Sequence, residues 1–424
     1  MKEINLLSSA WHKDENLQLT IPDRWDVTLV GDQKIAPIPY QEVYQKVYYS
    51  IGGQPLVELL RRKSRIGIIV DDMTRPTPLS RIMRVLMQIF NQAGVPDEAV
   101  RIIVGGGAHQ PNKTGEINKK IGNEASSRYE VIIHSSTKNL KSLGTTSRGT
   151  PLYLNGTIFD CDFLIGVGCI YPHPAAGFSG GAKILIPGLA GRETIHFMHD
   201  HLMPAGKRAG PLDTEFRREM EDIASHHGLG YIINVVLNQQ REIADVFSGD
   251  FILAHRQAVK FFKEHYTIES VRNADVVVAD MYPFDIDMQF AFDRGFWPLT
   301  KVNNQVAKII LAACPNGVGN HTLYPITTSL KGKYIQKIQE MRLKDLRDPI
   351  YKIKKIYINY KQKKNNYMIL SKGLNLKELK TIFPNGELFR TWGEILIELE
   401  RLKPGTTLKV AVYRCAPFLI PHDS

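Results

Sequence analysis

The sequence predicts an α/β protein built from two doubly wound, mostly parallel-sheet domains. Three observations support this fold class. Short apolar runs recur along the chain, and most are followed by a segment whose apolar residues have helical spacing. Several of the runs end in polar or glycine-rich turns, which is typical of buried parallel strands. The length of 424 residues is sufficient for two domains with separate cores.

Strands and helices are predicted to alternate in the first half of the chain. Residues 66–70 form an apolar run that ends at two acids, and the apolar residues of 79–94 share one helix face. The next strand is expected at 100–104, before a triple-glycine turn. Further strands are predicted at 129–134, 163–168 and 231–237, and helices at 214–227 and 251–266.

A second alternating segment begins at the apolar run 274–280. We place the domain boundary near residues 267–273, which gives a first domain of 1–270 and a second of 271–424. The last strand, about 407–415, either stays in the second domain or packs back on the first. The other elements expected here are strands at 307–313, 355–360 and 408–412 and helices at 328–346, 376–383 and 392–402.

Composition indicates a soluble, cytoplasmic protein with no membrane partner. Hydrophobic residues make up 43% of the chain, yet no window has the ~18 consecutive apolar residues of a membrane span. The first residues lack the apolar core of a secretory signal. The four cysteines form no CxxC pair, so buried reduced thiols are favoured over disulfides or zinc knuckles. They are Cys161, Cys169, Cys314 and Cys415.

The formal net charge of +11 allows several kinds of anionic partner. Part of the excess lies in two basic runs, at 352–355 and 361–364. Because no nucleic-acid-binding motif and no interleaved aromatics accompany them, we favour a solvated face and expect no nucleic-acid partner. A positive field also attracts small anionic substrates.

Three turns with chemically useful side chains follow three of the predicted strands. They are 71–78, 105–110 and 172–183. In open parallel sheets, ligands bind beyond the carboxyl ends of the strands, so we expect one site formed by all three turns. The active site is expected in the cleft between the two domains.

The third turn contains a glycine-rich loop that suits a phosphate. It runs Gly177-Phe178-Ser179-Gly180-Gly181-Ala182-Lys183. The Walker A pattern fails, because Ala182 precedes the lysine and Ile184 follows it, so NTP hydrolysis is not supported. Backbone N–H groups and the Ser179 hydroxyl could hold a monophosphate. The alternative is a glycine-rich turn with a surface lysine. Lys183 is either a point-charge ligand or a nucleophile that anchors a cofactor.

Histidines mark two of the turns and the segment that follows them. His109 ends the triple-glycine turn and His173 lies between two prolines, and rigid loops of this kind suit general acid/base catalysis. His196, His199 and His201 have spacings that can bind a metal, although surface histidines have the same pattern.

The turn 71–78 combines two acids with an arginine. Arg75 offers a planar fork for a substrate carboxylate. Asp72 could accept hydrogen bonds from ribose hydroxyls. The alternative is a capped turn, since Thr77 and the neighbouring prolines also suit a helix start.

Together these motifs resemble the nickel-pincer-nucleotide-dependent lactate racemase family. The resemblance depends on residues 72–78, 106–109 and 172–183 and on Pro187-Gly188, and it extends more loosely over most of the chain. It implies an isomerase, a racemase or epimerase that inverts C2 of a 2-hydroxy acid by hydride transfer to the cofactor. Cofactor biosynthesis proteins would be partners, and an oligomer is compatible with the sequence.

The resemblance also implies a role for each site residue. Lys183 would form the covalent tether to the pyridinium mononucleotide, and His199 would be the protein ligand of nickel. The loop 177–181 would hold the phosphate and Asp72 the ribose. His109 and His173 would be the acid/base pair. The substrate carboxylate would be bound by Arg75.

One segment departs from the family pattern. After Tyr282-Pro283 the family has Gln-Ala-x-Lys, whereas this chain has Phe290-Ala291-Phe292-Asp293. Tyr282, Phe290 and Asp293 are therefore expected at the substrate, and an acid replaces a cation there. We expect a larger or polyhydroxylated 2-hydroxy acid rather than lactate. The alternatives from other classes are a nucleotide- or phosphate-binding protein without catalysis and a zinc- or iron-dependent lyase.

Overall fold

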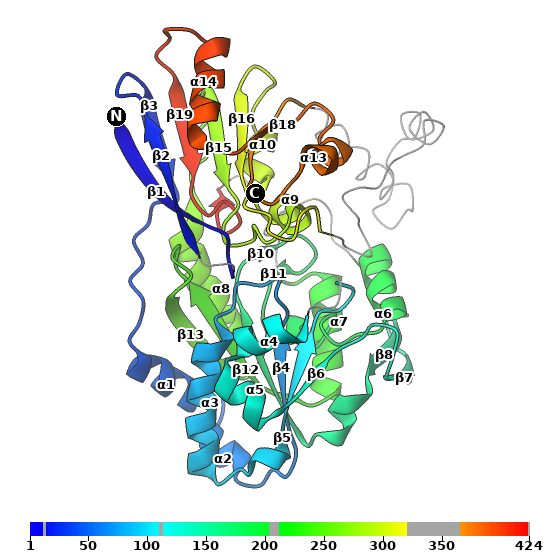
Figure 1. The fold of residues 1–424 in the computed structure, drawn as a ribbon. Helices are drawn as coiled ribbons and strands as arrows, with labels where there is room; N and C mark the ends of the chain where they lie inside the picture. The colour runs from blue at the N-terminus through cyan, green and yellow to red at the C-terminus, as the bar shows by residue number, and fades with distance from the viewer. Residues whose placement is uncertain (12–13, 110–112, 203–211, 320–364, 423–424) are drawn as a thin grey trace. The chain divides into compact units, whose positions relative to one another are not determined.

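The computed structural model describes residues 1–11, 14–109, 113–202, 212–319 and 365–422 (Figure 1). The chain divides into two compact units. Unit 1 comprises residues 1–33 and 266–424, and unit 2 comprises residues 34–265. The predicted helix 328–346 and strand 355–360 lie outside the described residues. Within the described part, no helix combines the length and apolar character needed to cross a membrane.

Unit 2 is built on a six-stranded sheet of order β13-β12-β9-β4-β5-β6. All neighbouring strands are parallel except β12 and β13. The strands are β4 (Ile66–Asp71), β5 (Val100–Gly105), β6 (Glu130–Ile133), β9 (Phe163–Cys169), β12 (Leu229–Leu237) and β13 (Ile243–Gly249). Every residue of β4 and β9 is buried, as expected for central strands covered on both faces.

Helices surround this sheet, as Figure 1 shows for α3, α4, α5 and α7. The helix α3 has a continuous buried stripe and ends at Gly94, whose left-handed backbone closes the last turn. The α-helices of unit 2 are α1 (Tyr40–Tyr48), α2 (Leu56–Leu60), α3 (Leu79–Ala93), α4 (Thr114–Ile121), α5 (Asn123–Arg128), α6 (Arg192–Phe197), α7 (Glu215–His226) and α8 (Leu253–Tyr266), whose last residue begins unit 1.

Shorter elements complete unit 2. Strands β7 (Leu140–Thr145) and β8 (Pro151–Asn155) pair antiparallel, as do β10 (Pro172–His173) and β11 (Gly177–Phe178). The 3-10 helices are η1 (Asp97–Ala99), η2 (Gly156–Asp160) and η3 (Gly181–Ile184), and η4 (Met198–Leu202) is a π-helical turn that continues α6.

Unit 1 has a second six-stranded sheet, which is parallel throughout. Its order is β18-β17-β16-β15-β19-β3. The strands are β3 (Asp26–Val30), β15 (Val276–Asp280), β16 (Ala307–Leu311), β17 (Met368–Leu370), β18 (Glu387–Phe389) and β19 (Lys409–Tyr413). The described helices are α9 (Met288–Gly295), α10 (Trp297–Thr300), α13 (Leu376–Ile382) and α14 (Trp392–Leu402). Two largely parallel sheets with helices confirm the predicted fold class.

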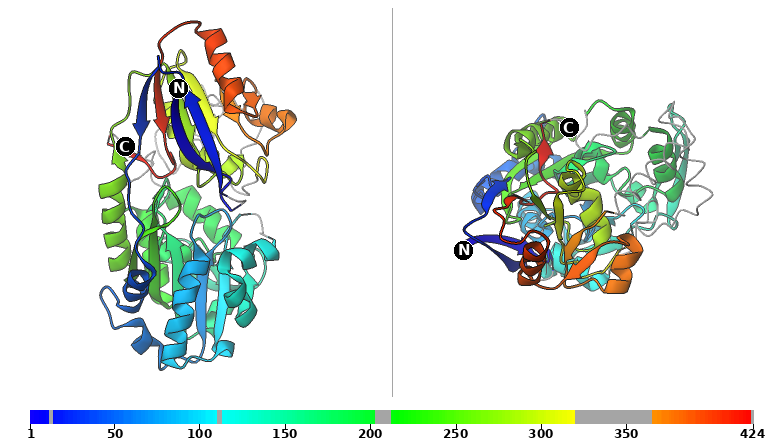
Figure 2. Two further views of the ribbon diagram at one scale, coloured as in Figure 1. Left: turned by 60° about the vertical axis from the view of Figure 1, so that its left-hand side comes forward. Right: turned by 90° about the horizontal axis from the view of Figure 1, so that it is seen from above.

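The N-terminal hairpin packs on the unit 1 sheet. Strands β1 (Lys2–Ser8) and β2 (Glu15–Ile21) pair antiparallel, and Figure 2 shows them beside the strands of this sheet. Ile4, Leu6 and Trp25 share one buried cluster with sheet residues. The indole N–H of Trp392 in α14 donates to the Thr20 carbonyl at 2.8 Å. A further short parallel pair joins β14 (Thr267–Ile268) to β20 (Ile420–Pro421).

The division of the chain differs from the expected boundary at the N-terminus. We predicted residues 1–270 as one domain, but 1–33 belong to unit 1 because β3 pairs with β19 along its whole length. The last long strand, predicted at about 407–415, therefore lies inside the unit 1 sheet, between β15 and β3. Burial of Val30 and Trp25 anchors the segment there.

The order of strands places a topological switch point in unit 2. From β4 the chain moves outward to β5 and β6 and then returns to β9, on the other side of β4. Loops leaving β4 and β9 therefore diverge at neighbouring carboxyl ends, which is where doubly wound sheets bind ligands.

Close packing of β9 gives a test of this core. A Cβ at Gly166 would lie 2.5 Å from Cγ2 of Ile184 and 2.6 Å from Cδ1 of Ile232. We expect Gly166→Ala to lower the free energy of unfolding by about 1–3 kcal/mol through overpacking. Urea unfolding followed by fluorescence measures the change.

Gly115→Ala in α4 is the matched control. No heavy atom lies within 4 Å of a Cβ built there. Alanine should leave the unfolding free energy unchanged or raise it by up to about 1 kcal/mol. Equal destabilisation by both substitutions would contradict the packing argument.

Candidate active site

The three predicted turns meet at the switch point of unit 2. The backbone N–H of Gly107 donates to the carbonyl of Gly188 at 2.9 Å, which joins the turn after β5 to the segment after the glycine loop. The guanidinium carbon of Arg75, from the turn after β4, lies 6.0 Å from the ring centroid of Tyr171. The segments around the three predicted turns therefore lie close together in unit 2.

Asp72 and His109 form a tight pair within this site. The Nδ1 atom of His109 lies 2.7 Å from Oδ2 of Asp72, and Asp72 is 1% exposed. The other carboxylate oxygen accepts the backbone N–H of Thr74 at 3.1 Å and also the Thr74 hydroxyl. Although burial alone would raise the pKa of Asp72, His109 and Arg75 hold it well below its usual value.

These contacts change the expected role of Asp72. We predicted that its carboxylate accepts hydrogen bonds from a ribose. Because the group is enclosed and both oxygens already accept hydrogen bonds from Thr74 and His109, the structure connects Asp72 with the imidazole instead.

Arg75 lies on the other side of His109. Its Nη2 atom is 3.2 Å from Nε2 of His109, so the imidazole lies between a carboxylate and a guanidinium. Burial is the largest cause that lowers the pKa of His109, and Arg75 and Lys183 lower it further, against the opposing effect of Asp72. The ring is therefore biased towards its neutral form, which can accept a proton.

Lys120 holds the turn that carries Asp72 and Arg75. Its side chain is completely buried, and Nζ lies 2.6 Å from Oδ1 of Asp71. The same ammonium donates to the carbonyls of Asp72 and Arg75, the latter at 2.9 Å. This residue was not predicted from the sequence, because a lysine in the last turn of α4 resembles an ordinary surface charge.

His173 is buried and has a different set of neighbours. Its Nδ1 atom accepts the backbone N–H groups of Ala175 at 3.2 Å and Ala176 at 3.3 Å. Backbone pairing of β10 with β11 aligns His173 with Gly177. The rigid loop expected around this histidine is thus a two-stranded turn that fixes the ring through its own amides.

Several polar groups of the glycine loop form hydrogen bonds within the protein. The Ser179 hydroxyl donates to the Cys169 carbonyl and accepts the Tyr171 N–H at 2.8 Å, so its single proton is committed within the protein. Backbone N–H groups of Phe178, Ser179 and Gly181 also have acceptors within the fold. The phosphate role predicted for Ser179 and these amides has no support from this conformation.

The two central glycines are required by packing beneath the loop. A Cβ at Gly180 would lie 2.5 Å from Cδ1 of Ile170 and 2.6 Å from Oδ1 of Asn234. A Cβ at Gly181 would lie 3.0 Å from the ring of His255. Both glycines also have positive φ, of 77° and 58°. Because neither glycine has a side chain, the loop can pack directly against Asn234 and His255.

Arg217 of α7 binds the backbone of the same loop. Its guanidinium donates to the Ala176 carbonyl at 2.8 Å, to the Phe178 carbonyl and to the Gly180 carbonyl at 3.4 Å. Burial lowers the pKa of Arg217 to about 9. A signal existed in the sequence, because Arg217 falls on the buried stripe of α7 with Phe216 and Met220.

Lys183 belongs to η3, directly after the loop. It is partly buried, and its charge is among the causes that lower the pKa of His109. Helix α7 contacts both η3 and η4, so it links the lysine segment to the histidine segment 198–202. This arrangement fits a ligand that is anchored at the lysine and extends towards His109.

His199, one of the three clustered histidines, has a backbone contact that orients its ring. Its Nδ1 atom lies 2.8 Å from the Ile195 carbonyl, which can only accept, so Nδ1 carries the proton and Nε2 has a lone pair. Its ring also meets Phe216 edge-on at 5.2 Å. His201 instead packs on Phe197 at 4.4 Å. The donor chemistry at His199 therefore fits one imidazole bond to nickel.

The described residues contain no group of three or more His, Cys, Asp or Glu side chains that could hold a metal ion by themselves. A single protein ligand is consistent with a metal that is carried mainly by an organic cofactor. Among the described residues, His196, His199 and His201 therefore do not form such a group.

The residues predicted near the substrate in the second half lie in unit 1. Tyr282 is buried, and its hydroxyl donates to Asp14 at 2.9 Å. Phe290 is buried in α9. Asp293, on the same helix, is exposed and accepts the Gln289 amide at 2.8 Å. These contacts describe unit 1 alone and leave the three substrate roles as predictions.

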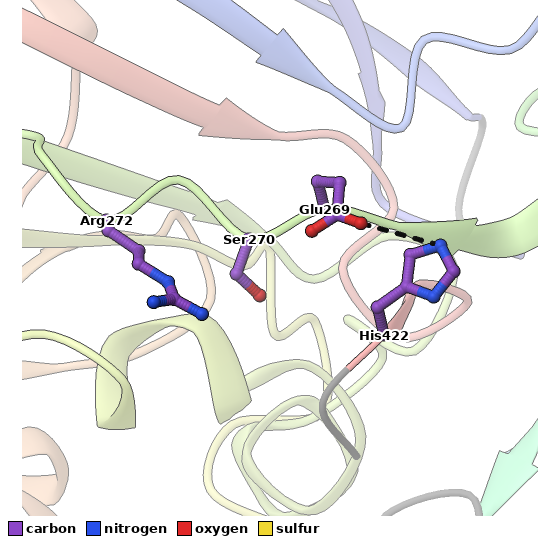
Figure 3. A pocket seen from close by; sticks show the side chains of 4 residues that line it. All are labelled: Glu269, Ser270, Arg272 and His422. Atoms are coloured by element: carbon purple, nitrogen blue, oxygen red, sulfur yellow. Dashed lines mark ion pairs between the residues drawn. The ribbon is translucent and has the colours of Figure 1, made fainter.

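A small hollow of about 200 Å³ also lies in unit 1 (Figure 3). Glu269, Ser270, Arg272 and His422 line it. Nε2 of His422 is 3.6 Å from Oε1 of Glu269, and both side chains are largely exposed. None of the predicted site residues lines this hollow, so we regard it as a surface ion pair.

Comparison with known proteins agrees with this geometry. Residues 12–210 match the lactate racemase N-terminal domain family. The chain is 30% identical over 282 residues to proteins named lactate racemase from Lactiplantibacillus plantarum and from Thermoanaerobacterium thermosaccharolyticum. Each alignment spans 65% of this chain and 66% of the relative, so just under two thirds of those relatives' length is matched. Proteins with this name are isomerases.

Solved structures share the fold. The apoprotein of lactate racemase from T. thermosaccharolyticum has a TM-score of 0.73 at 24% identity and covers 99% of this chain and 100% of that chain. A protein of Thermotoga maritima has a TM-score of 0.63 at 16% identity, with 91% and 98% covered. The matched N-terminal domain, the named relatives and the shared fold together confirm the predicted resemblance of this chain to the lactate racemase family.

Proposed function

We propose that this protein is a racemase or epimerase that inverts C2 of a 2-hydroxy acid. The observation that carries the proposal is the buried arrangement of Asp72, His109 and Arg75 at the switch point. It combines a proton acceptor with a cation suited to a carboxylate, which are the two groups that a 2-hydroxy acid needs. The similarity to proteins named lactate racemase supports the same reaction class.

Each group has a defined task in this proposal. Arg75 binds the substrate carboxylate and places the neighbouring hydroxyl at His109. His109 Nε2 accepts the hydroxyl proton, and the Asp72 carboxylate stabilises the resulting imidazolium. His173 serves the oxygen of the opposite enantiomer, so the two histidines form the acid/base pair. Burial of Asp72 and His173 keeps water away from the proton being moved.

The cofactor in this proposal is the nickel-pincer nucleotide. Lys183 tethers it covalently and His199 Nε2 ligates its nickel. When bound, the cofactor supplies a centre that takes the C2 hydrogen as hydride and returns it. The chain's own residues orient the substrate and handle the hydroxyl proton.

We further propose that lactate is not the preferred substrate. The family segment Gln-Ala-x-Lys ends in a lysine. The corresponding residue of this chain is Asp293, which is exposed. A carboxylate there removes one favourable contact with a small anionic acid and can accept hydrogen bonds from distal hydroxyls. A larger or polyhydroxylated 2-hydroxy acid fits this change better.

Mass spectrometry of the Lys183 peptide tests the cofactor assignment. The chain is produced together with cofactor biosynthesis enzymes and analysed for nickel and for a covalent mass increase on the lysine. We expect about one nickel per chain, with the adduct on Lys183. Lys183→Ala should remove both, whereas His199→Ala should keep the adduct and lose nickel.

His196→Ala and His201→Ala are the matched controls and should keep both nickel and adduct. Zinc or iron without an adduct would favour the lyase alternative. A chain that binds nucleotide but has neither metal nor adduct would favour a binding protein.

Substrate preference is checked with the loaded enzyme and a panel of single enantiomers. Loss of optical rotation is followed for lactate, aryl-lactates, hydroxy-diacids and aldonates. We expect the highest kcat/KM with a larger or polyhydroxylated acid. Highest kcat/KM with lactate would overturn the substrate assignment and leave the racemase assignment in place.

The pH profile tests the role of His109. A base must be neutral to accept a proton, and the pKa of His109 is lowered from its ordinary value of 6.5, chiefly by burial. The acid limb of kcat/KM should therefore have its midpoint below pH 6.5. A midpoint above that value would argue against His109 as the base.

A further inference from the structure

The two active-site histidines have neighbours of fixed hydrogen-bonding character. A carboxylate with a strongly lowered pKa can only accept, and guanidinium and backbone N–H groups can only donate. The protonated nitrogen of each ring can therefore be deduced from its partners. This deduction requires no knowledge of the substrate or the cofactor.

At His109 both nitrogens are determined. Nδ1 lies 2.7 Å from the Asp72 carboxylate, so Nδ1 must carry the proton. Nε2 lies 3.2 Å from Nη2 of Arg75, a donor, so Nε2 must present its lone pair. The Asp72 contact alone would permit an imidazolium, but a proton on Nε2 would face the guanidinium.

At His173 the assignment is the reverse. Nδ1 accepts N–H groups from Ala175 and Ala176, at 3.2 and 3.3 Å, so Nδ1 cannot carry a proton without losing both contacts. The neutral ring must therefore carry its proton on Nε2. The two amides belong to the β10–β11 turn, which disfavours ring rotation.

We propose that His109 and His173 are held in opposite neutral tautomers, with Asp72 acting as the positioning residue for His109. The Nε2 atom of His109 is a proton acceptor and the Nε2–H of His173 is a hydrogen-bond donor. The catalytic meaning of this difference depends on the proposed racemase function, whereas the tautomers themselves do not.

The consequence is a site prepared for one enantiomer before substrate binds. A hydroxyl that faces His109 gives its proton to Nε2, and the positive charge on the ring is balanced by Asp72. A hydroxyl that faces His173 meets an N–H. For that ring to accept the hydroxyl proton at Nε2, Nε2 must first lose its own proton and Nδ1 must gain one, which gives up the two amide contacts.

Nuclear magnetic resonance on the full-length, cofactor-free chain tests the tautomers. Histidine labelled with nitrogen-15 distinguishes protonated from unprotonated ring nitrogens through long-range coupling to the ring hydrogens. Signals are assigned by their loss in His109→Gln and His173→Gln. We expect, at neutral pH, the Nδ1–H form for His109 and the Nε2–H form for His173.

Asp72→Asn tests the positioning role. Thr74 donates to Oδ1, which keeps the amide oxygen on that side and turns the amide N–H₂ towards His109. Nδ1 of His109 then meets a donor, and the ring should switch to the Nε2–H form. In the loaded enzyme we expect a loss of turnover of about 10²- to 10⁴-fold, with the Lys183 adduct retained.

Asp97→Asn is the control of the same chemical change on a partly exposed carboxylate paired with Arg128, and it should alter neither the spectrum nor turnover. Identical tautomers at His109 and His173, or an unchanged His109 signal in Asp72→Asn, would overturn the inference. Loss of the adduct in Asp72→Asn with the His109 tautomer unchanged would return Asp72 to the ribose. Absence of nickel and adduct in the wild type would refute the proposed function alone.

Discussion

The site depends on a single buried ammonium group. Lys120 pairs with Asp71, and its ammonium group also donates hydrogen bonds to the carbonyls of Asp72 and Arg75. A buried cation of this kind is tolerated only when nearly every donor is satisfied, so its position dictates the course of the turn. Because the turn presents the Asp72 carboxylate and the Arg75 guanidinium to His109, the lysine positions both partners of that imidazole.

The glycine loop is also held by a buried cation, which here is Arg217. Arg217 donates to the alternate carbonyls of Ala176, Phe178 and Gly180, while Asn234 and His255 fill the space that glycine side chains would need. Burial keeps the pKa of His255 well below normal, so its ring adds no competing charge beneath the loop. The glycine density that suggested close approach of a phosphate is thus explained by close approach of the protein to itself.

Much of the fold could be predicted from the sequence because its central strands are continuous apolar runs. The runs 66–70, 100–104 and 163–168 correspond to β4, β5 and β9, and Arg75 from the first turn contacts His109 from the second. Strand β3 was missed, since only one of its five residues is buried and the partner, β19, lies almost four hundred residues later. Strands β17 and β18 have only three residues each, too few for a pattern.

Side-chain roles were harder to predict than positions. The residue types at 72, 109, 173, 183 and 199 predicted chemistry, but they did not predict that Asp72 pairs with His109 or that Ser179 donates to the Cys169 carbonyl. Hydrogen-bond partners are a property of three-dimensional packing, which no spacing reveals. The pairing of β3 with β19 also has a consequence for biosynthesis. Unit 2 is one uninterrupted stretch that can fold as soon as it leaves the ribosome, whereas the unit 1 sheet must wait for nearly the whole chain, with its first strand unpaired until then.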